Sequence, residues 1–179
     1  TVIVATGATP YIPEFPGRDE GHVLTAWQVL AGEAKPGASV VIADWRADWV
    51  GLGLAERLAS AGASVRLCTN AAMAGEMLQI YTRNHYVGRL HRLGVTITTH
   101  ARFYGVDMES AFFQDTLTGE PMVFEGIDSV ILSLGHSADS ELGLALDHER
   151  FSVNTIGDCV SPRTAEEAIY EGFIAGITV

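Results

Sequence analysis

The sequence predicts an α/β fold of three layers around a mostly parallel sheet, together with part of a second domain of the same kind. A strand, a turn, a helix and a strand follow one another across residues 39–69, and this βαβ unit is the core signature of a parallel sheet. Apolar strands with an Ala-Thr-Gly and a Gly-Asp segment stand before and after it, at 5–7 and 157–158. The 179 residues suffice for one full core and a piece of another.

The chain opens on a short buried strand over residues 1–5. Three prolines between positions 10 and 16 then forbid regular structure, so we expect an extended linker and a domain boundary there. The predicted organisation is one domain made of residues 1–16 and 150–179, and a second domain, residues 17–149, inserted into it.

Within the inserted domain, Thr25 can cap a short helix that ends at Leu30. A β-branched strand over residues 40–43, a helix over 51–61 and a strand over 65–68 then make the βαβ unit. The helix is predicted from apolar residues at three-to-four spacing and from the glycine that follows it.

A longer helix is predicted over residues 75–93, with Leu78, Tyr81 and His85 along one stripe. A last helix, over 165–175, begins at a capping box. We expect helices on both faces of the parallel sheet, and an antiparallel set with a hairpin turn at Thr118-Gly119. The remaining strands are predicted at 95–99, 103–106, 111–115, 122–125 and 130–134.

Composition and charge exclude several classes of protein. No apolar run reaches the roughly 18 residues that a membrane span needs, so no membrane partner is expected. A net charge of −11 with a single lysine argues against a nucleic-acid surface, because phosphate binding depends on Lys and Arg. The expected partners are small molecules or another protein.

The cysteines and histidines do not form a recognisable reactive site. Cys68 and Cys159 are far apart in the sequence and each follows a strand pattern, so we interpret both as buried structural thiols, and no metal site is predicted. His85, His91 and His136 have no recognisably spaced carboxylate or nucleophile. No catalytic residue is predicted, and the few cysteines fit a reducing, cytoplasmic compartment.

The turn after the first strand of the βαβ unit departs from a working dinucleotide site. Such a turn has the pattern G-x-G-x-x-G, in which glycines let the backbone approach a pyrophosphate. Here the chain has ADWRADWVGLG at 43–53, with Asp44 and Trp45 in place of glycines, and Gly51 among the few that remain. Asp44 and Asp48 should repel a diphosphate, although Arg46 offsets part of that charge. We predict a degenerate site.

The second strand of the unit lacks the usual ribose-binding acid. It is followed by Asn70, which is able to bond a ribose hydroxyl but is better explained as an exposed residue that begins a loop. Arg66 lies inside the strand, and we expect it to face solvent rather than to clamp a phosphate.

Four segments together resemble a family. They are ATGATP at 5–10, VVIADW with GLGLAERLASAG at 40–62, LSLGH at 132–136 and IGDCVSPRTAEEAIYEGFIAG at 156–176. These segments resemble the C-terminal nucleotide-binding region of the trimethylamine and histamine dehydrogenases and the 2,4-dienoyl-CoA reductases, which are NADH:flavin oxidoreductases. The resemblance covers nearly the whole chain, and the Asp-Trp replacement is closer to the amine dehydrogenases.

The resemblance implies a Rossmann-like nucleotide-binding domain of the glutathione-reductase type, which binds FAD or NAD(P). It also implies that the chain is a piece of a longer flavoenzyme, with FMN and a 4Fe–4S cluster in a missing N-terminal barrel. ADP or FAD is the expected cofactor of the remaining part, and NAD(P) is a weaker expectation. The candidate cofactor-binding residues are Thr6, Gly7, Asp44, Trp45, Gly51, Gly135, Gly157 and Asp158.

Three hypotheses for function remain open. The first is a nucleotide-binding segment of an amine-dehydrogenase-like flavoenzyme without catalytic residues of its own. The second is a functional NAD(P)H domain, as in the dienoyl-CoA reductases. The third is a non-catalytic module that docks an electron-transfer protein. Because the strands over 1–5 and 151–156 should lie side by side with unpaired edges, a homo-oligomer formed through the terminal segments is also plausible.

Overall fold

The computed structural model describes residues 1–146 and 150–178 and divides the chain into two compact units. The outer unit comprises Thr1–Tyr11 and Gly135–Val179, and the inserted unit comprises Ile12–Leu134. Both junctions lie earlier in the chain than the predicted boundaries at 16/17 and 149/150. The predicted end of the inserted domain, residues 147–149, lies outside the described residues.

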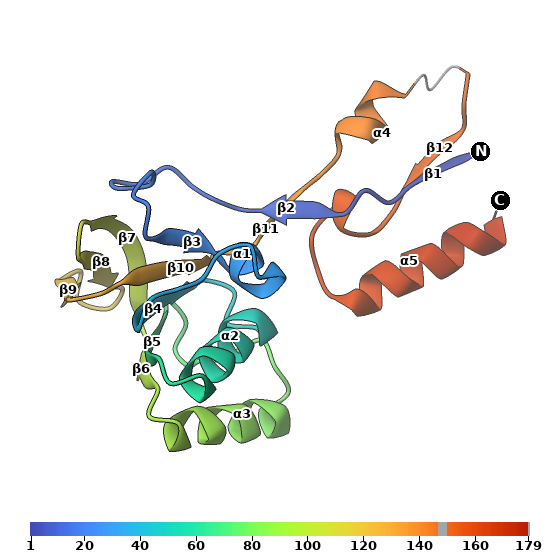
Figure 1. The fold of residues 1–179 in the computed structure, drawn as a ribbon. Helices are drawn as coiled ribbons and strands as arrows, with labels where there is room; N and C mark the ends of the chain where they lie inside the picture. Colours follow the sequence, from blue (N-terminus) through green and yellow to red (C-terminus); the bar gives the residue numbers. More distant parts are fainter. Residues whose placement is uncertain (147–149, 179) are drawn as a thin grey trace. The chain divides into compact units, whose positions relative to one another are not determined.

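A five-stranded parallel sheet forms the centre of the inserted unit (Figure 1). Its order is β3-β10-β4-β5-β6, and every neighbouring pair is parallel. The predicted parallel pairing of the strands at 40–43 and 65–68 is confirmed, since Val40 pairs with Val65 and Ala43 with Cys68. The strands are β3 (Val23–Thr25), β4 (Ser39–Asp44), β5 (Ser64–Thr69), β6 (Thr96–Thr98) and β10 (Ser129–Ser133).

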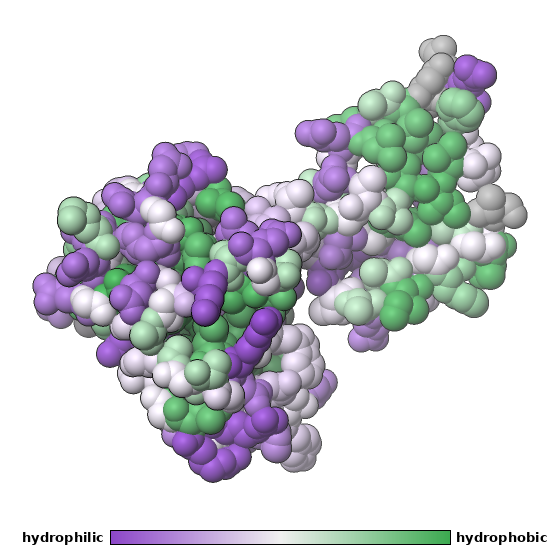
Figure 2. Space-filling model, in the orientation of Figure 1, coloured by the Kyte–Doolittle hydropathy of each residue, from purple (hydrophilic) through white to green (hydrophobic). Residues whose placement is uncertain are grey.

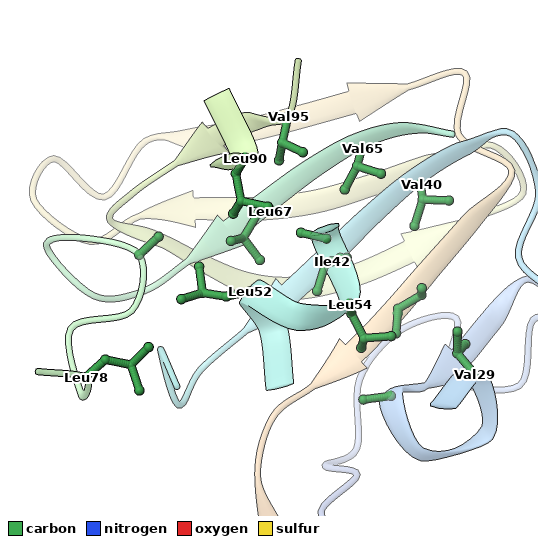
Figure 3. Close-up of a cluster of buried hydrophobic side chains, with 14 residues drawn as sticks. Val29, Val40, Ile42, Leu52, Leu54, Val65, Leu67, Leu78, Leu90 and Val95 are labelled. Atoms are coloured by element: carbon green, nitrogen blue, oxygen red, sulfur yellow. The ribbon is translucent and has the colours of Figure 1, made fainter. Parts of the chain in front are cut away.

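Three helices pack against one face of this sheet: α1 (Ala26–Ala31), α2 (Trp49–Ser60) and α3 (Ile80–Arg92). Alternate residues of the strands, such as Val40 and Ile42 of β4, meet Leu52 and Leu54 of α2 in a buried cluster (Figure 3). Thr25 caps α1 as predicted, and Gln28 completes a capping box that the sequence analysis did not identify.

Helix α3 is shorter than predicted. Residues 75–79 are not helical, and Gly75 has a φ of +69°, a left-handed conformation that interrupts the expected first turn. The predicted stripe is also wrong: Leu78 is buried from the turn before the helix, whereas Tyr81 is 87% exposed. Leu90 is the buried residue of α3, and Tyr86 and Val87 pack beside it.

The other face of the parallel sheet is covered by a three-stranded antiparallel sheet, β7-β8-β9. The prediction of helices on both faces is therefore wrong, because the connection from β6 to β10 is made by this meander and not by a helix. Phe113 is 2% exposed, and its ring meets that of Phe103 edge to face with 5.4 Å between the ring centroids. The strands are β7 (Ala101–Asp107), β8 (Ser110–Asp115) and β9 (Pro121–Glu125), with the predicted hairpin turn at 118–119.

In the described part of the outer unit, two small strand pairs lie together with two α-helices. The segments 1–5 and 151–156 lie side by side as predicted, because β1 (Val2–Val4) pairs in parallel with β12 (Val153–Thr155). The antiparallel pair is β2 (Ala8–Pro10) with β11 (His136–Ala138). The helices are α4 (Glu141–Ala145) and α5 (Ala165–Thr178).

Helix α5 exposes much of its apolar surface. Ile169 is 73% exposed, Tyr170 65% and Phe173 61%, and green hydrophobic atoms gather on this unit in Figure 2. Among the described residues, no helix combines the length and the apolar character that crossing a membrane requires. The α/β, Rossmann-like fold class is confirmed, with a second, incomplete set of elements in the outer unit.

Candidate functional site

The carboxyl ends of β4 and β10 form the topological switch point of the inserted unit. The chain leaves β4 toward β5 on one side and returns through β10 on the other, and in open α/β sheets ligands bind at such a point. A backbone hydrogen bond joins the two strand ends at this point, because the N–H of Trp45 donates to the carbonyl of Ser133 at 3.1 Å. Three of the predicted site residues, Asp44, Trp45 and Gly51, are brought together here.

Asp44 is buried under this turn instead of facing a ligand. It is 0% exposed, its Oδ1 accepts a hydrogen bond from the N–H of Ala47 at 3.0 Å, and its Oδ2 has no hydrogen-bond partner among the described residues. A Cβ on Gly51 would lie 2.6 Å from Oδ2, so the carboxyl group rests directly against the first turn of α2. Glycine is required at 51 to accommodate an aspartate, and not only to pack the helix on the sheet.

Burial raises the pKa of Asp44 to about 7, because desolvation penalises its charged form. The hydrogen bond from Ala47 opposes this rise in pKa, and the nearby negative charge of Asp48 adds to it. Asp44 therefore does not present an open carboxylate that would repel a diphosphate, as the sequence led us to expect. Asp44 is an enclosed acid that titrates near neutral pH.

Asp48 occupies the N-terminus of α2. Its Oδ1 accepts a hydrogen bond from the N–H of Val50 at 2.9 Å, and its Oδ2 accepts one from Nε of Arg46 at 2.8 Å. A helix N-terminus is a ready anion site, and in a dinucleotide fold the pyrophosphate binds there. In this chain the anion at that position is the chain's own carboxylate. Asp48 was predicted to repel phosphate, and its capping role was missed although Asp is a preferred N-cap residue.

The remaining residues of the turn are held by burial and by a backbone hydrogen bond. Ala47 is buried with a φ of +49°, a left-handed conformation that is unusual for alanine, and its carbonyl accepts a hydrogen bond from the N–H of Met77 at 3.1 Å. Trp45 is half-buried and packs against the cluster beneath the antiparallel sheet. The buried Ala47 and the half-buried Trp45 therefore fix the path of this turn.

The end of β5 provides neither a ribose-binding acid nor a phosphate clamp. Asn70 is exposed, as expected for a residue that begins a loop. Arg66 differs from the prediction of a solvent-facing side chain, because it is half-buried, with Cζ 4.4 Å from the ring centroid of Phe124 and Nη1 3.1 Å from Oγ1 of Thr98. Its role is to join the parallel sheet to the meander.

The Ala-Thr-Gly segment lies in the outer unit between β1 and β2. Gly7 has a φ of +81°, and its carbonyl accepts a hydrogen bond from the N–H of Asp139 at 3.0 Å, while the Thr6 hydroxyl donates to the carbonyl of Asp139. A Cβ on Gly7 would meet no described atom within 4 Å, so the turn presents open backbone. Gly135 begins the return into the outer unit with a φ of +110° and accepts a hydrogen bond from the N–H of Tyr11 at 3.0 Å.

The Gly-Asp segment forms a 3₁₀ turn after β12. Gly157 has a φ of +70°, and its N–H donates to Oε2 of Glu171 at 2.6 Å. Asp158 is half-buried, and its Oδ1 accepts a hydrogen bond from the N–H of Arg163 at 3.1 Å. Glu171 also forms an ion pair with Arg163, and this pair, followed by the Gly157 hydrogen bond, lowers the pKa of Glu171. Glu171 was not predicted as a site residue, because nothing in its spacing marks a residue of α5 as a support for this turn.

A family model described as pyridine nucleotide-disulphide oxidoreductase matches residues 1–172 of the chain. The chain is 27% identical to N,N-dimethylglycine/sarcosine dehydrogenase of Chromohalobacter salexigens over 95% of its own length and 30% of that protein. The structure of 6-hydroxypseudooxynicotine amine oxidase from Pseudomonas geniculata N1 is similar, with a TM-score of 0.88 and 29% identity over 98% of this chain and 28% of that one.

Histamine dehydrogenase from Rhizobium sp. 4-9 shares the fold, with a TM-score of 0.88 and 23% identity over 97% of this chain and 30% of that one. The chain thus spans about 30% of the length of the curated relatives it matches.

Proposed function

The chain belongs to the pyridine nucleotide-disulphide oxidoreductase family, and from this premise we propose that it is the nucleotide-binding region of a flavin-dependent oxidoreductase of the amine-dehydrogenase type. The names of its relatives support this proposal, since they include a sarcosine dehydrogenase and an amine oxidase. We further propose that the inserted unit retains the shape of a dinucleotide domain without binding NAD(P)H.

One observation carries the second part of the proposal. The N-terminus of α2, where a pyrophosphate would bind, is capped by Asp48, which is in turn held by Arg46. A dinucleotide would have to displace this carboxylate and then place its own charge above the buried Asp44. The residues of this turn therefore do not fit NAD(P)H.

The outer unit fits an adenine nucleotide better. We propose that Thr6, Gly7, Gly157 and Asp158 form part of a site for ADP or for the ADP portion of FAD, because the Gly7 turn leaves its backbone open and Asp158 lies after the carboxyl end of β12. A bound flavin would supply the redox chemistry of the enzyme. In the longer protein we expect FMN and a 4Fe–4S cluster to be held outside these residues, along with the substrate site.

Calorimetric titration of the 179-residue chain and of a longer protein that contains it, with ADP, NADH and NADPH, tests the proposal. We expect no binding of NADH or NADPH below about 1 mM, since the usual phosphate contacts are missing. Micromolar NADH binding, with bleaching of the flavin absorbance in the longer protein, would overturn the proposal in favour of a functional NAD(P)H domain. ADP binding that is lost in Asp158→Ala and kept in Asp48→Ala would support the nucleotide site in the outer unit.

A further inference from the structure

The outward face of α3 differs in charge from the rest of the molecule. We propose that this face is a docking surface for a protein partner that presents carboxylates. The surface, called the basic stripe below, consists of Tyr81, His85, Arg89 and Arg92. The stripe contains no residue of the dinucleotide turn, and the proposal does not depend on the proposed function.

Charge is segregated along the chain. Residues 77–106 contain four of the 11 basic residues, three of the six histidines and none of the 22 acidic residues. The rest of the chain therefore has a large excess of negative charge. In Figure 2 hydrophilic side chains dominate the lower edge of the inserted unit, where α3 lies. At physiological ionic strength charges are screened beyond about 8 Å, so an approaching partner responds to this local positive surface more than to the net charge.

The helix turns the stripe outward. The residues at 81, 85, 89 and 92 follow one another at spacings of three and four, so they share one side of α3. The opposite side carries Leu90, Tyr86 and Val87, which pack into the core. The stripe therefore faces away from the sheet, and Arg89 is the member that contacts α2, through Glu56.

One of the two arginines of the stripe is paired with a carboxylate of a neighbouring element. Glu56 of α2 forms an ion pair with Arg89, whose side chain is still 47% exposed. Glu76 accepts a hydrogen bond from the N–H of Ala72 at 3.1 Å, which directs it to its own loop. A hollow of about 410 Å³ opens beside the stripe, and its lining residues are Ser60, His85, Arg89, Arg92 and Leu93.

The N-terminal end of the stripe is apolar. Met77 is 74% exposed, Ile80 53% and Tyr81 87%. From Tyr81 to Arg92 the helix rises by about 16 Å. Tyrosine, methionine and arginine are enriched at protein interfaces, where exposed tyrosine and arginine act as anchors. A protein surface that has carboxylates beside an apolar contact complements both ends of the stripe, whereas two arginines on an acidic molecule offer little to a nucleic-acid backbone.

Amide chemical-shift mapping of the ¹⁵N-labelled 179-residue chain tests the proposal. The probe is acetylated octaglutamate in 50 mM salt, and an octathymidylate serves as the comparison anion. We expect octaglutamate to shift the amides of residues 77–93 and to saturate them. The double variant Arg89→Gln/Arg92→Gln should weaken this binding about 5-fold, from the loss of two exposed charge pairs.

The matched control is Arg18→Gln/Lys35→Gln, which makes the same change in net charge. Arg18 is ion-paired with Glu14, as Arg89 is with Glu56, and Lys35 is an exposed cation elsewhere on the inserted unit. We expect the control to weaken binding less than 2-fold. The single variant Arg92→Gln, which leaves the ion pair between Arg89 and Glu56 intact, should weaken octaglutamate binding about 2-fold. It replaces the double variant in the test if the double variant unfolds.

Three results would overturn the proposal. The first is the absence of shifts in residues 77–93 at millimolar octaglutamate. The second is equal weakening by the stripe variant and its control, which would assign the effect to net charge. The third is tighter binding of octathymidylate than of octaglutamate at this face, which would favour a nucleic acid as the partner.

Discussion

Replacing the buried acid at the switch point should make the protein more stable at neutral and alkaline pH. Asp44 is 0% exposed, and burial raises its pKa from 3.8 to about 7. In the variant Asp44→Asn the amide oxygen can still accept the hydrogen bond from the N–H of Ala47. The NH₂ group takes the place of Oδ2 against Gly51. The main change is therefore the loss of an ionisable group from a buried position.

The magnitude follows from linkage between protonation and folding. The folded-state pKa of Asp44 lies above its unfolded value, so between pH 3.8 and about 7 the unfolded chain releases a proton that the folded chain keeps. The free energy of unfolding falls as pH rises through this window, by about 1.4 kcal/mol per pH unit and about 4 kcal/mol in all. Asparagine does not titrate, so Asp44→Asn should escape this loss.

Urea unfolding of the wild type and of Asp44→Asn between pH 5.5 and 8.5 measures the effect. The advantage of the variant should grow by about 2 kcal/mol between pH 5.5 and 7 and then become constant. Asp19→Asn, which removes the same charge from an exposed position, is the control and should not show this growth. Parallel stability curves for wild type and Asp44→Asn would refute the reasoning, because they would mean that Asp44 is already ionised or not enclosed.

Three further changes probe the same turn and its surroundings. Gly51→Ala should lower the free energy of unfolding by about 1–3 kcal/mol, since its Cβ would lie 2.6 Å from Oδ2 of Asp44, whereas Gly53→Ala, where a Cβ meets no described atom within 4 Å, should be neutral or stabilising in the same urea assay. Asp48→Ala removes the N-cap of α2 and should cost about 1 kcal/mol, read from the shift of the urea midpoint; an unchanged midpoint would contradict the capping role. Burial raises the pKa of the Cys68 thiol to about 12, so a disulfide reagent at pH 8 should leave Cys68 unlabelled in the folded chain and label it in urea, as peptide mass analysis would reveal.

Much of the fold was predictable because the regular spacing of apolar residues that indicates a helix or a strand is contained in a short stretch of sequence. The βαβ unit at 39–69 and the hairpin at 118–119 depend on alternation and turn chemistry that short windows contain. Strand β3 was missed because it spans three residues and pairs with β10, about a hundred residues further along. The start of α3 was predicted too early because the position of Leu78 fits the spacing of apolar residues in a helix. In the structure the left-handed Gly75 forms a turn before the helix, and Leu78 is buried from that turn.

The candidate site was predictable in its location but not in its chemistry. The absence of glycines at 44 and 45 identified an unusual turn, and the structure places Asp44, Trp45 and Gly51 together there. The sequence could not reveal that one aspartate points under the turn and the other caps α2, since both follow the strand within a few residues. That difference depends on the left-handed Ala47, which turns the backbone between the two acids.

Under the proposed function, the two aspartates explain how the inserted unit would keep a dinucleotide fold without binding NAD(P)H. A helix N-terminus leaves backbone N–H groups that require an acceptor, and in a working site the phosphate of the ligand provides it. Here Asp48 provides it from within the chain, and Arg46 balances its charge. Under the proposed function, ligand binding would break these contacts before making its own and would raise the local negative charge near Asp44. The substitution of a single residue by glycine would remove one obstacle and leave the others, so the closed turn is a property of the whole segment from Asp44 to Gly51.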